Sequence, residues 1–150
     1  MLLAAIAACL GCAAPAAAQA PGAVANWTAG DKTGFGIARS LSSPVWFTLQ
    51  GGELSEVYAP DLGTPSFRDL QFVVSDGQTF TERETDGALH TTTQADPRSL
   101  IYRQVSTSRS GRRQLTKTYV TDPDRAAVLV DAGRPVAQPR IVACRYAATC

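Results

Sequence analysis

The sequence has few of the residues that most often carry catalysis or bind metals. Histidine occurs once, as His90, and no cysteine lies between Cys12 and Cys144. A nucleophilic triad needs a histidine beside a serine or cysteine, and the chain has no Gly-x-Ser-x-Gly motif. One histidine without a partner at ligand spacing does not make a zinc site. We therefore expect a structural or surface role for His90, and the residues predict no cofactor.

A surplus of charge of one sign is also missing. Lys and Arg together number 14, Asp and Glu 13, and the formal net charge is +1. The local group of Arg109, Arg112 and Arg113 is interrupted by Ser110 and Gly111, which is typical of a charged hairpin turn. Nucleic-acid binding domains carry a basic patch, so we predict no nucleic-acid partner.

No charged residue precedes Asp31. Residues 1–20 form an apolar and then alanine-rich stretch, which resembles a secretory leader and is too short for a convincing membrane span. The stretch up to Ala20 suits an ordinary signal peptidase, whereas the tetrapeptide that ends at Cys9 resembles a bacterial lipobox. We expect export to the periplasm or the cell exterior, with membrane contact only if Cys9 is lipidated.

No stretch after Pro44 has a sustained helical period, and short segments rich in β-branched and aromatic residues alternate with turn signals. In the segment 114–120, Leu115, Lys117 and Tyr119 share one face. This pattern predicts an all-β fold, an antiparallel β-sandwich. The expected strands are 45–49, 53–58, 69–74, 79–85, 88–93, 100–106, 114–120 and 125–130.

The end of the chain has a different character. From Gly133 the alternation stops, prolines appear, and Cys144 and Cys150 follow within a few residues. We interpret 133–150 as an atypical tail that is either truncated or out of frame, and 21–132 as the body of the domain.

The carboxylates do not form an obvious acid–base pair. A glycosidase needs two carboxyl groups that face each other across a cleft, one of them a proton donor. Glu82 and Glu84 lie on one face of the same expected strand, so they cannot face each other across a sugar. Arg68 and Asp69 are adjacent and point to opposite faces of an extended chain. The sequence therefore predicts no catalytic residue.

Aromatic side chains are the remaining candidates for contact with carbohydrate. Trp27, Phe35 and Tyr58 could each stack on a sugar ring. For Tyr58, as for Trp46, burial inside a sandwich is the alternative.

Several blocks then indicate a family. They are 27–36 (WTAGDKTGFG), 45–49 (VWFTL), 52–58 (GELSEVY), 60–72 (PDLGTPSFRDLQF), 102–105 (YRQV) and 115–123 (LTKTYVTDP). In this order they resemble the N-terminal β-domain of bacterial glucoamylases and glucodextranases, from about residue 26 to residue 131.

The resemblance implies a supersandwich of the galactose-mutarotase-like type that packs against a catalytic (α/α) toroid. It implies that the two catalytic glutamates lie in that toroid, so none is carried over here, and that Asp61, Arg68 and Asp69 are structural or domain-contact residues. Calcium occurs in some relatives, without a matching ligand cluster in this sequence. Because the family's β-domain is longer, residues 21–132 would form an incomplete sandwich.

Three functions remain open at this point. The first is the non-catalytic N-terminal domain of a secreted glycoside hydrolase that acts on α-glucans, with the toroid as its partner. The second is a free-standing carbohydrate-binding module that uses Trp27, Phe35 or Tyr58 as stacking platforms. The third is a lipoprotein with a purely structural role, which would be marked by lipidation at Cys9.

Overall fold

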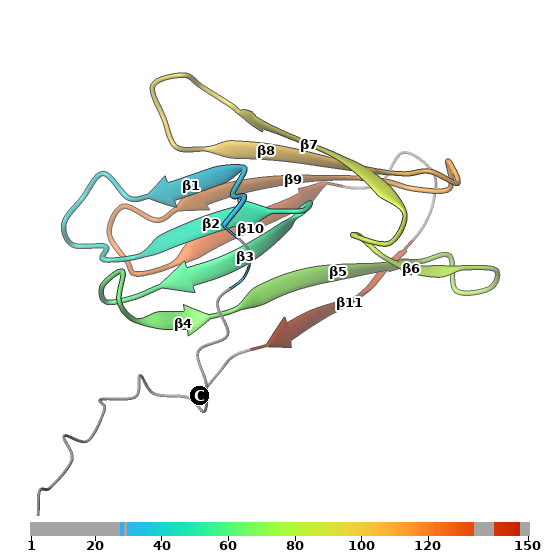
Figure 1. Cartoon of the computed structure of the whole chain (residues 1–150), viewed down its shortest axis with the longest axis horizontal. Helices are drawn as coiled ribbons and strands as arrows, with labels where there is room; N and C mark the ends of the chain where they lie inside the picture. The colour runs from blue at the N-terminus through green and yellow to red at the C-terminus, as the bar shows by residue number, and fades with distance from the viewer. Residues whose placement is uncertain (1–27, 29, 134–139, 148–150) are drawn as a thin grey trace, which may run out of the picture.

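The computed structural model describes residues 28, 30–133 and 140–147, the last segment as backbone. Within these residues there is no helix, and the strands form two antiparallel sheets (Figure 1). The strands are β1 (Gly34–Ile37), β2 (Trp46–Gln50), β3 (Glu53–Tyr58), β4 (Pro65–Phe67), β5 (Asp69–Ser75), β6 (Thr81–Arg83), β7 (Ala88–Gln94), β8 (Tyr102–Ser108), β9 (Gln114–Thr121), β10 (Val128–Gly133) and β11 (Arg140–Ala147). The predicted all-β class is confirmed.

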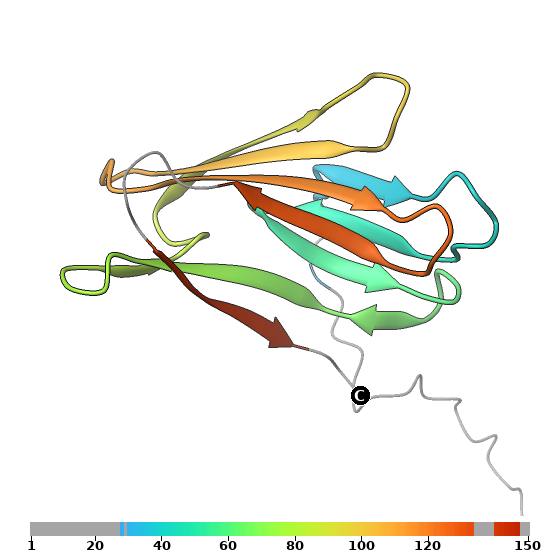
Figure 2. The same cartoon turned by 180° about the vertical axis from the view of Figure 1, so that it is seen from behind.

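The first sheet, sheet A, has the order β1-β2-β3-β5-β11, with β4 paired to β3 and β6 paired to β5. The second, sheet B, has the order β10-β9-β8-β7. The sheets lie as two layers: β2 and β3 are in front of β10 in Figure 1, and β10 is in front of them in the reverse view of Figure 2. This is the predicted β-sandwich.

Turns lie at the positions where glycine and aspartate residues in the sequence predicted them. Gly51 and Gly52 join β2 to β3 with φ of 55° and 90°, a backbone conformation that favours glycine. The expected strand 79–85 is shortened to β6. The Asp76 carboxylate accepts hydrogen bonds from the backbone N–H groups of the three residues that directly precede β6. These bonds come from Gln78 (2.9 Å), Thr79 (2.8 Å) and Phe80 (3.0 Å) and hold that segment in a turn.

The core lies between the sheets and takes side chains from both. One cluster contains Phe47, Leu49, Leu54 and Tyr119, and a second contains Phe72, Val74 and Leu115. The expected alternation along β9 is confirmed, since Leu115, Lys117 and Tyr119 are all buried. Because side chains alternate along β2, Thr48 lies on the opposite, outer face of sheet A from Phe47 and Leu49.

The tail contains a strand that the sequence interpretation did not expect. Strand β11 pairs with β5, with Cys144 opposite Phe72 and a register shift between Ile141 and Ala143. This irregularity, together with pairing to a strand far away in the sequence, explains why local alternation did not reveal it.

Parts of several sequence predictions lie outside the described residues: the leader 1–20 with Cys9, Trp27, and Cys150. Among the residues that the structure does describe, none belongs to a helix long and apolar enough to cross a membrane.

Candidate functional site

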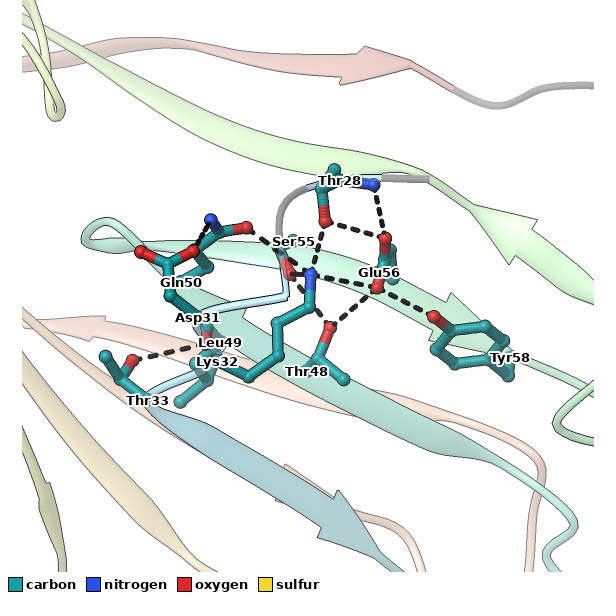
Figure 3. A network of polar contacts seen from close by, with 10 residues as sticks. All are labelled: Thr28, Asp31, Lys32, Thr33, Thr48, Leu49, Gln50, Ser55, Glu56 and Tyr58. Atoms are coloured by element: carbon teal, nitrogen blue, oxygen red, sulfur yellow. Dashed lines mark hydrogen bonds and ion pairs between the residues drawn. The ribbon is translucent and has the colours of Figure 1, made fainter. Parts of the chain in front are cut away.

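The most elaborate polar site on sheet A is built around the carboxylate of Glu56. Glu56 lies on β3 opposite Thr48 of β2, on the outer face of the sheet. Its Oε1 accepts hydrogen bonds from the backbone N–H (2.8 Å) and Oγ1 (2.6 Å) of Thr28. Its Oε2 accepts bonds from Thr48 Oγ1 (3.2 Å) and from the hydroxyl of Tyr58 (2.7 Å) (Figure 3).

Lys32 completes this network, which we call the Glu56 network. Its Nζ lies 3.0 Å from Glu56 Oε2, and the Glu56 side chain is only 4% exposed. The same ammonium donates to Ser55 Oγ at 3.0 Å and to the hydroxyl of Thr28. Thr28 and Lys32, which precede β1, are therefore bound to β3 by polar contacts, as Figure 3 shows.

The surroundings of Glu56 decide what its carboxylate can do. Burial alone would raise its pKa, but the bonds donated by Thr28, Tyr58 and Lys32 lower it to about 2. Burial and the bond to this carboxylate in turn raise the pKa of Tyr58. Glu56 is therefore ionised at any physiological pH and is not a proton donor of the kind a glycosidase requires.

A second polar cluster lies between the sheets. Lys117 of β9 forms an ion pair with Glu84, and both side chains are fully buried. Lys117 Nζ also donates to the carbonyl oxygen of Gly52 at 2.7 Å, and Glu84 Oε1 accepts the N–H of Phe72 at 3.1 Å. Burial raises the pKa of Glu84 and lowers that of Lys117, and the ion pair opposes both changes. Because neither charged side chain is exposed to solvent, we interpret the cluster as structural.

Arg113 lies in the turn between β8 and β9, as the sequence interpretation expected, but its side chain has a buried, structural role that was not predicted. Arg109 and Arg112 are exposed, as expected of a charged turn, but Arg113 is only 1% exposed. Its guanidinium donates to the Glu82 carboxylate (3.1 Å) and to backbone carbonyl oxygens of Arg83 (2.6 Å), Glu84 (3.1 Å) and Asp86 (3.0 Å). The alternation that turns Leu115 inward extends to position 113 and could have identified it.

The residues expected to support the domain lie between the end of β3 and the start of β5 and do not join the Glu56 network. Asp61 is exposed, and its Oδ1 accepts bonds from Gly63 N (2.9 Å) and Thr64 Oγ1 (3.0 Å), which fixes the turn between β3 and β4. Arg68 is exposed between β4 and β5, and half-buried Asp69 begins β5. Their role in domain contact stays a prediction.

The aromatic candidates differ in exposure. Phe35 on β1 is 40% exposed, whereas Tyr58 is 9% exposed and its hydroxyl is bound to Glu56. The buried alternative therefore describes Tyr58, which has no open ring face for a sugar. Trp46 is half-buried.

His90 has neighbours that resemble part of a triad but cannot act as one. Its Nδ1 lies 3.0 Å from Ser106 Oγ, yet Ser106 is fully buried, so no substrate reaches the hydroxyl. Across the described part of the chain, no group of three or more His, Cys, Asp or Glu side chains is arranged to hold a metal ion.

Comparisons of the sequence and of the fold with known proteins identify the family of this chain. The family model described as glucodextranase, domain N, matches residues 17–134. A glucoamylase from Clostridium sp. (strain G0005) is 35% identical over 116 residues, which are 77% of this chain and 16% of the relative. The crystal structure of a bacterial glucoamylase complexed with acarbose superposes with a TM-score of 0.68 at 36% identity, over 77% of this chain and 17% of that one.

Both matches cover most of this chain but only about a sixth of the relatives' own length. The order of the sequence blocks that suggested the family, the two-sheet architecture and the three comparisons all agree. The chain belongs to the glucodextranase domain N family.

Proposed function

We propose that this chain is the non-catalytic N-terminal part of an exported glycoside hydrolase that acts on α-glucans. The partner in this proposal is the catalytic portion of the hydrolase, which corresponds to the much larger part of the relatives that this chain does not span. The relatives themselves are named glucoamylases, which supports the proposed substrate class.

One observation supports the non-catalytic role: Glu56 and Glu84, the carboxylate residues that are buried within the described part of the chain, are bound by groups of the protein itself. Glu56 is held ionised by donors from the chain, and Glu84 is paired with Lys117 and bonded to Phe72 N–H. A glycosidase needs one carboxyl group that gives a proton and a second that faces it across the substrate. Glu56 and Glu84 lie instead on the outer face and in the interior of the sandwich.

The test is a direct comparison of hydrolysis and binding by the purified chain. With maltooligosaccharides and dextran as substrates, we expect no release of glucose above the buffer control. Glucose release by the chain alone would overturn the non-catalytic role.

The carbohydrate-binding alternative is tested with the same sugars by calorimetric titration. Phe35 is the aromatic candidate that the structure shows exposed, so a binding module should lose affinity in Phe35→Ala. Leu89→Ala is the matched control, because Leu89 is an exposed apolar residue of β7 in sheet B, with 62% of its surface accessible. Binding that is lost only in Phe35→Ala would favour the module over the domain fragment.

Export is tested separately. Residues 1–20 fused to a periplasmic reporter enzyme should direct it out of the bacterial cytoplasm. Incorporation of labelled palmitate that is abolished by Cys9→Ser would identify the lipoprotein route, and cleavage near Ala20 without label would identify the ordinary signal peptidase.

A further inference from the structure

Strand β7 forms one margin of sheet B, and none of the described strands pairs with its other side. Figures 1 and 2 both show β7 and its loop to β8 along the outer limit of the described ribbon. A strand in this position presents a row of backbone N–H and C=O groups that have no partner within its sheet. Another strand can pair with such a row.

The other margins of the two sheets carry features that oppose pairing between molecules. Strand β10 has the exposed carboxylate of Asp131 within it. In sheet A, β1 has four residues, two of them glycine, and β4 and β6 have three residues each. The pairing of β11 with β5 contains a register shift. Charge, short length and bulges are usual means by which edge strands avoid association.

Strand β7 lacks all of these features. Its seven residues, ALHTTTQ, include no proline and no Asp, Glu, Lys or Arg. Its register with β8 continues without a shift from Ala88 opposite Ser108 to Gln94 opposite Tyr102. Burial lowers the pKa of His90, so this side chain is neutral at pH 7. The margin is therefore long, regular and uncharged.

The backbone bonds at the two ends of β7 show which of its residues face the free margin. Gly87 O accepts the N–H of Arg109 at 2.9 Å, and Ala95 N donates to Ile101 O at 2.7 Å. Because bonds alternate along antiparallel strands, the odd-numbered residues of β7 exchange bonds with β8. The residues whose N–H and C=O groups point to the free margin are the even-numbered ones, Ala88, His90, Thr92 and Gln94.

We propose that β7 is a homodimer interface, at which a second copy of this chain pairs with it in antiparallel register about Thr91. Ala88 then lies opposite the partner's Gln94. His90 likewise lies opposite the partner's Thr92. All residues that face the free margin exchange hydrogen bonds, about eight in total, and sheet B continues through both copies. A twofold axis relates the copies, so the contact is closed and does not propagate.

The strand is complementary to itself in this register, which favours a second copy as the occupant. Thr91 has an exposed side chain and meets the partner's Thr91, and threonine pairs across strands are favourable. No charged side chain of β7 meets another of the same sign. One strand per copy buries less surface than a standard-size interface, so we expect a dissociation constant of roughly 10–100 μM.

Sedimentation equilibrium of the full chain, from about 5 to 500 μM, measures the association. We expect the average mass of wild type to rise from one chain toward two. Thr91→Lys places two ammonium groups opposite each other at the axis and should raise the dissociation constant at least about tenfold. Gln114→Lys is the matched control, because it adds the same charge at an exposed position of β9 and should associate as wild type does.

Hydrogen exchange is a second measurement that needs no variant, so it applies even if Thr91→Lys does not fold. The amides of His90 and Thr92 should exchange about fivefold more slowly at a concentration ten times the dissociation constant than in dilute solution. The Val130 amide is the internal control. Because Asp122 N donates to Ala127 O at 2.9 Å, the same alternation directs the Val130 amide to the free margin of β10, and its rate should not change.

Four results would overturn the homodimer. The first is wild type that stays monomeric at about 500 μM. The second is equal association of wild type and Thr91→Lys. The third is a mass that continues to rise beyond two copies, which would indicate open-ended association. The fourth is a monomer whose His90 and Thr92 amides are protected at every concentration, because another segment of the chain then covers β7.

Discussion

Lys117 and Glu84 form an ion pair in which neither side chain reaches solvent, and the pair joins β9 of sheet B to the residue that follows β6 of sheet A. Burial of two charges is unfavourable, and the compensation here comes from their mutual attraction and from bonds to Gly52 O and Phe72 N. The aromatic rings of Phe72 and Tyr119 lie 5.4 and 5.5 Å from the ammonium. The interior of this sandwich is therefore held partly by charge.

Removal of one partner should be costly. We expect Lys117→Met to lower the free energy of unfolding by about 3–5 kcal/mol, because it leaves Glu84 buried without a counter-charge. The double variant Lys117→Met/Glu84→Gln should recover a large part of this loss. Urea unfolding measures both, with Thr118→Ser on the outer face of β9 as the control. A single variant as stable as wild type would show that the charge on Glu84 is not buried in solution.

Arg113 gives a prediction with a control at the neighbouring position. We expect Arg113→Lys to lower the free energy of unfolding by about 2–3 kcal/mol, because an ammonium cannot reach both the Glu82 carboxylate and the carbonyl groups that the guanidinium joins. Arg112→Lys, at an exposed position, should stay within about 0.5 kcal/mol of wild type. Equal effects in the two variants, measured by thermal unfolding, would contradict the buried role.

Alanine substitutions at Gly51 and Gly52 distinguish the effect of backbone strain on stability from the effect of a steric clash. Both have positive φ, but an added Cβ at Gly52 would lie 2.0 Å from His90 Nδ1, whereas one at Gly51 meets no atom within 4 Å. Each alanine variant should lose about 1–3 kcal/mol from the backbone conformation alone, and Gly52→Ala should lose more.

The extra loss in Gly52→Ala should disappear when His90→Ala is added, since the imidazole is then gone. Urea midpoints of the two single and one double variant measure this. An unchanged deficit in Gly52→Ala/His90→Ala would mean that strain alone explains the position.

Glu56 predicts a pH dependence of stability. Its pKa falls from 4.5 to about 2 in the folded chain, so its contribution is complete above pH 4.5 and is lost as the pH falls toward 2. The difference in stability between wild type and Glu56→Gln should be constant near neutral pH and should shrink at pH about 3. Urea unfolding at the two pH values measures it, and a difference that does not change with pH would contradict the depressed pKa.

The features that the sequence predicted are those set by neighbouring residues. Gly51 and Gly52 define their turn locally, and the alternation through Leu115, Lys117 and Tyr119 depends on one strand alone. These signals were sufficient for the fold class and for most strand positions.

The Glu56 network could not be predicted in the same way. Thr28 and Glu56 are 28 residues apart in the chain, and their contact depends on how the fold places Thr28 against β3. Strand β11 was missed for the same reason, because its pairing with β5 is set by the arrangement of the sheet rather than by its own alternation. Short β1, with glycine at Gly34 and Gly36, likewise has little local signal.

The order of strands has a mechanical consequence. The outermost strands of sheet A, β1 and β11, come from opposite ends of the described chain, whereas sheet B is a run of consecutive strands from β7 to β10. A force that pulls the two ends of the described chain apart therefore acts first on β1 and β11. The consecutive strands of sheet B are stretched only after β1 and β11 have lost their pairing with β2 and β5.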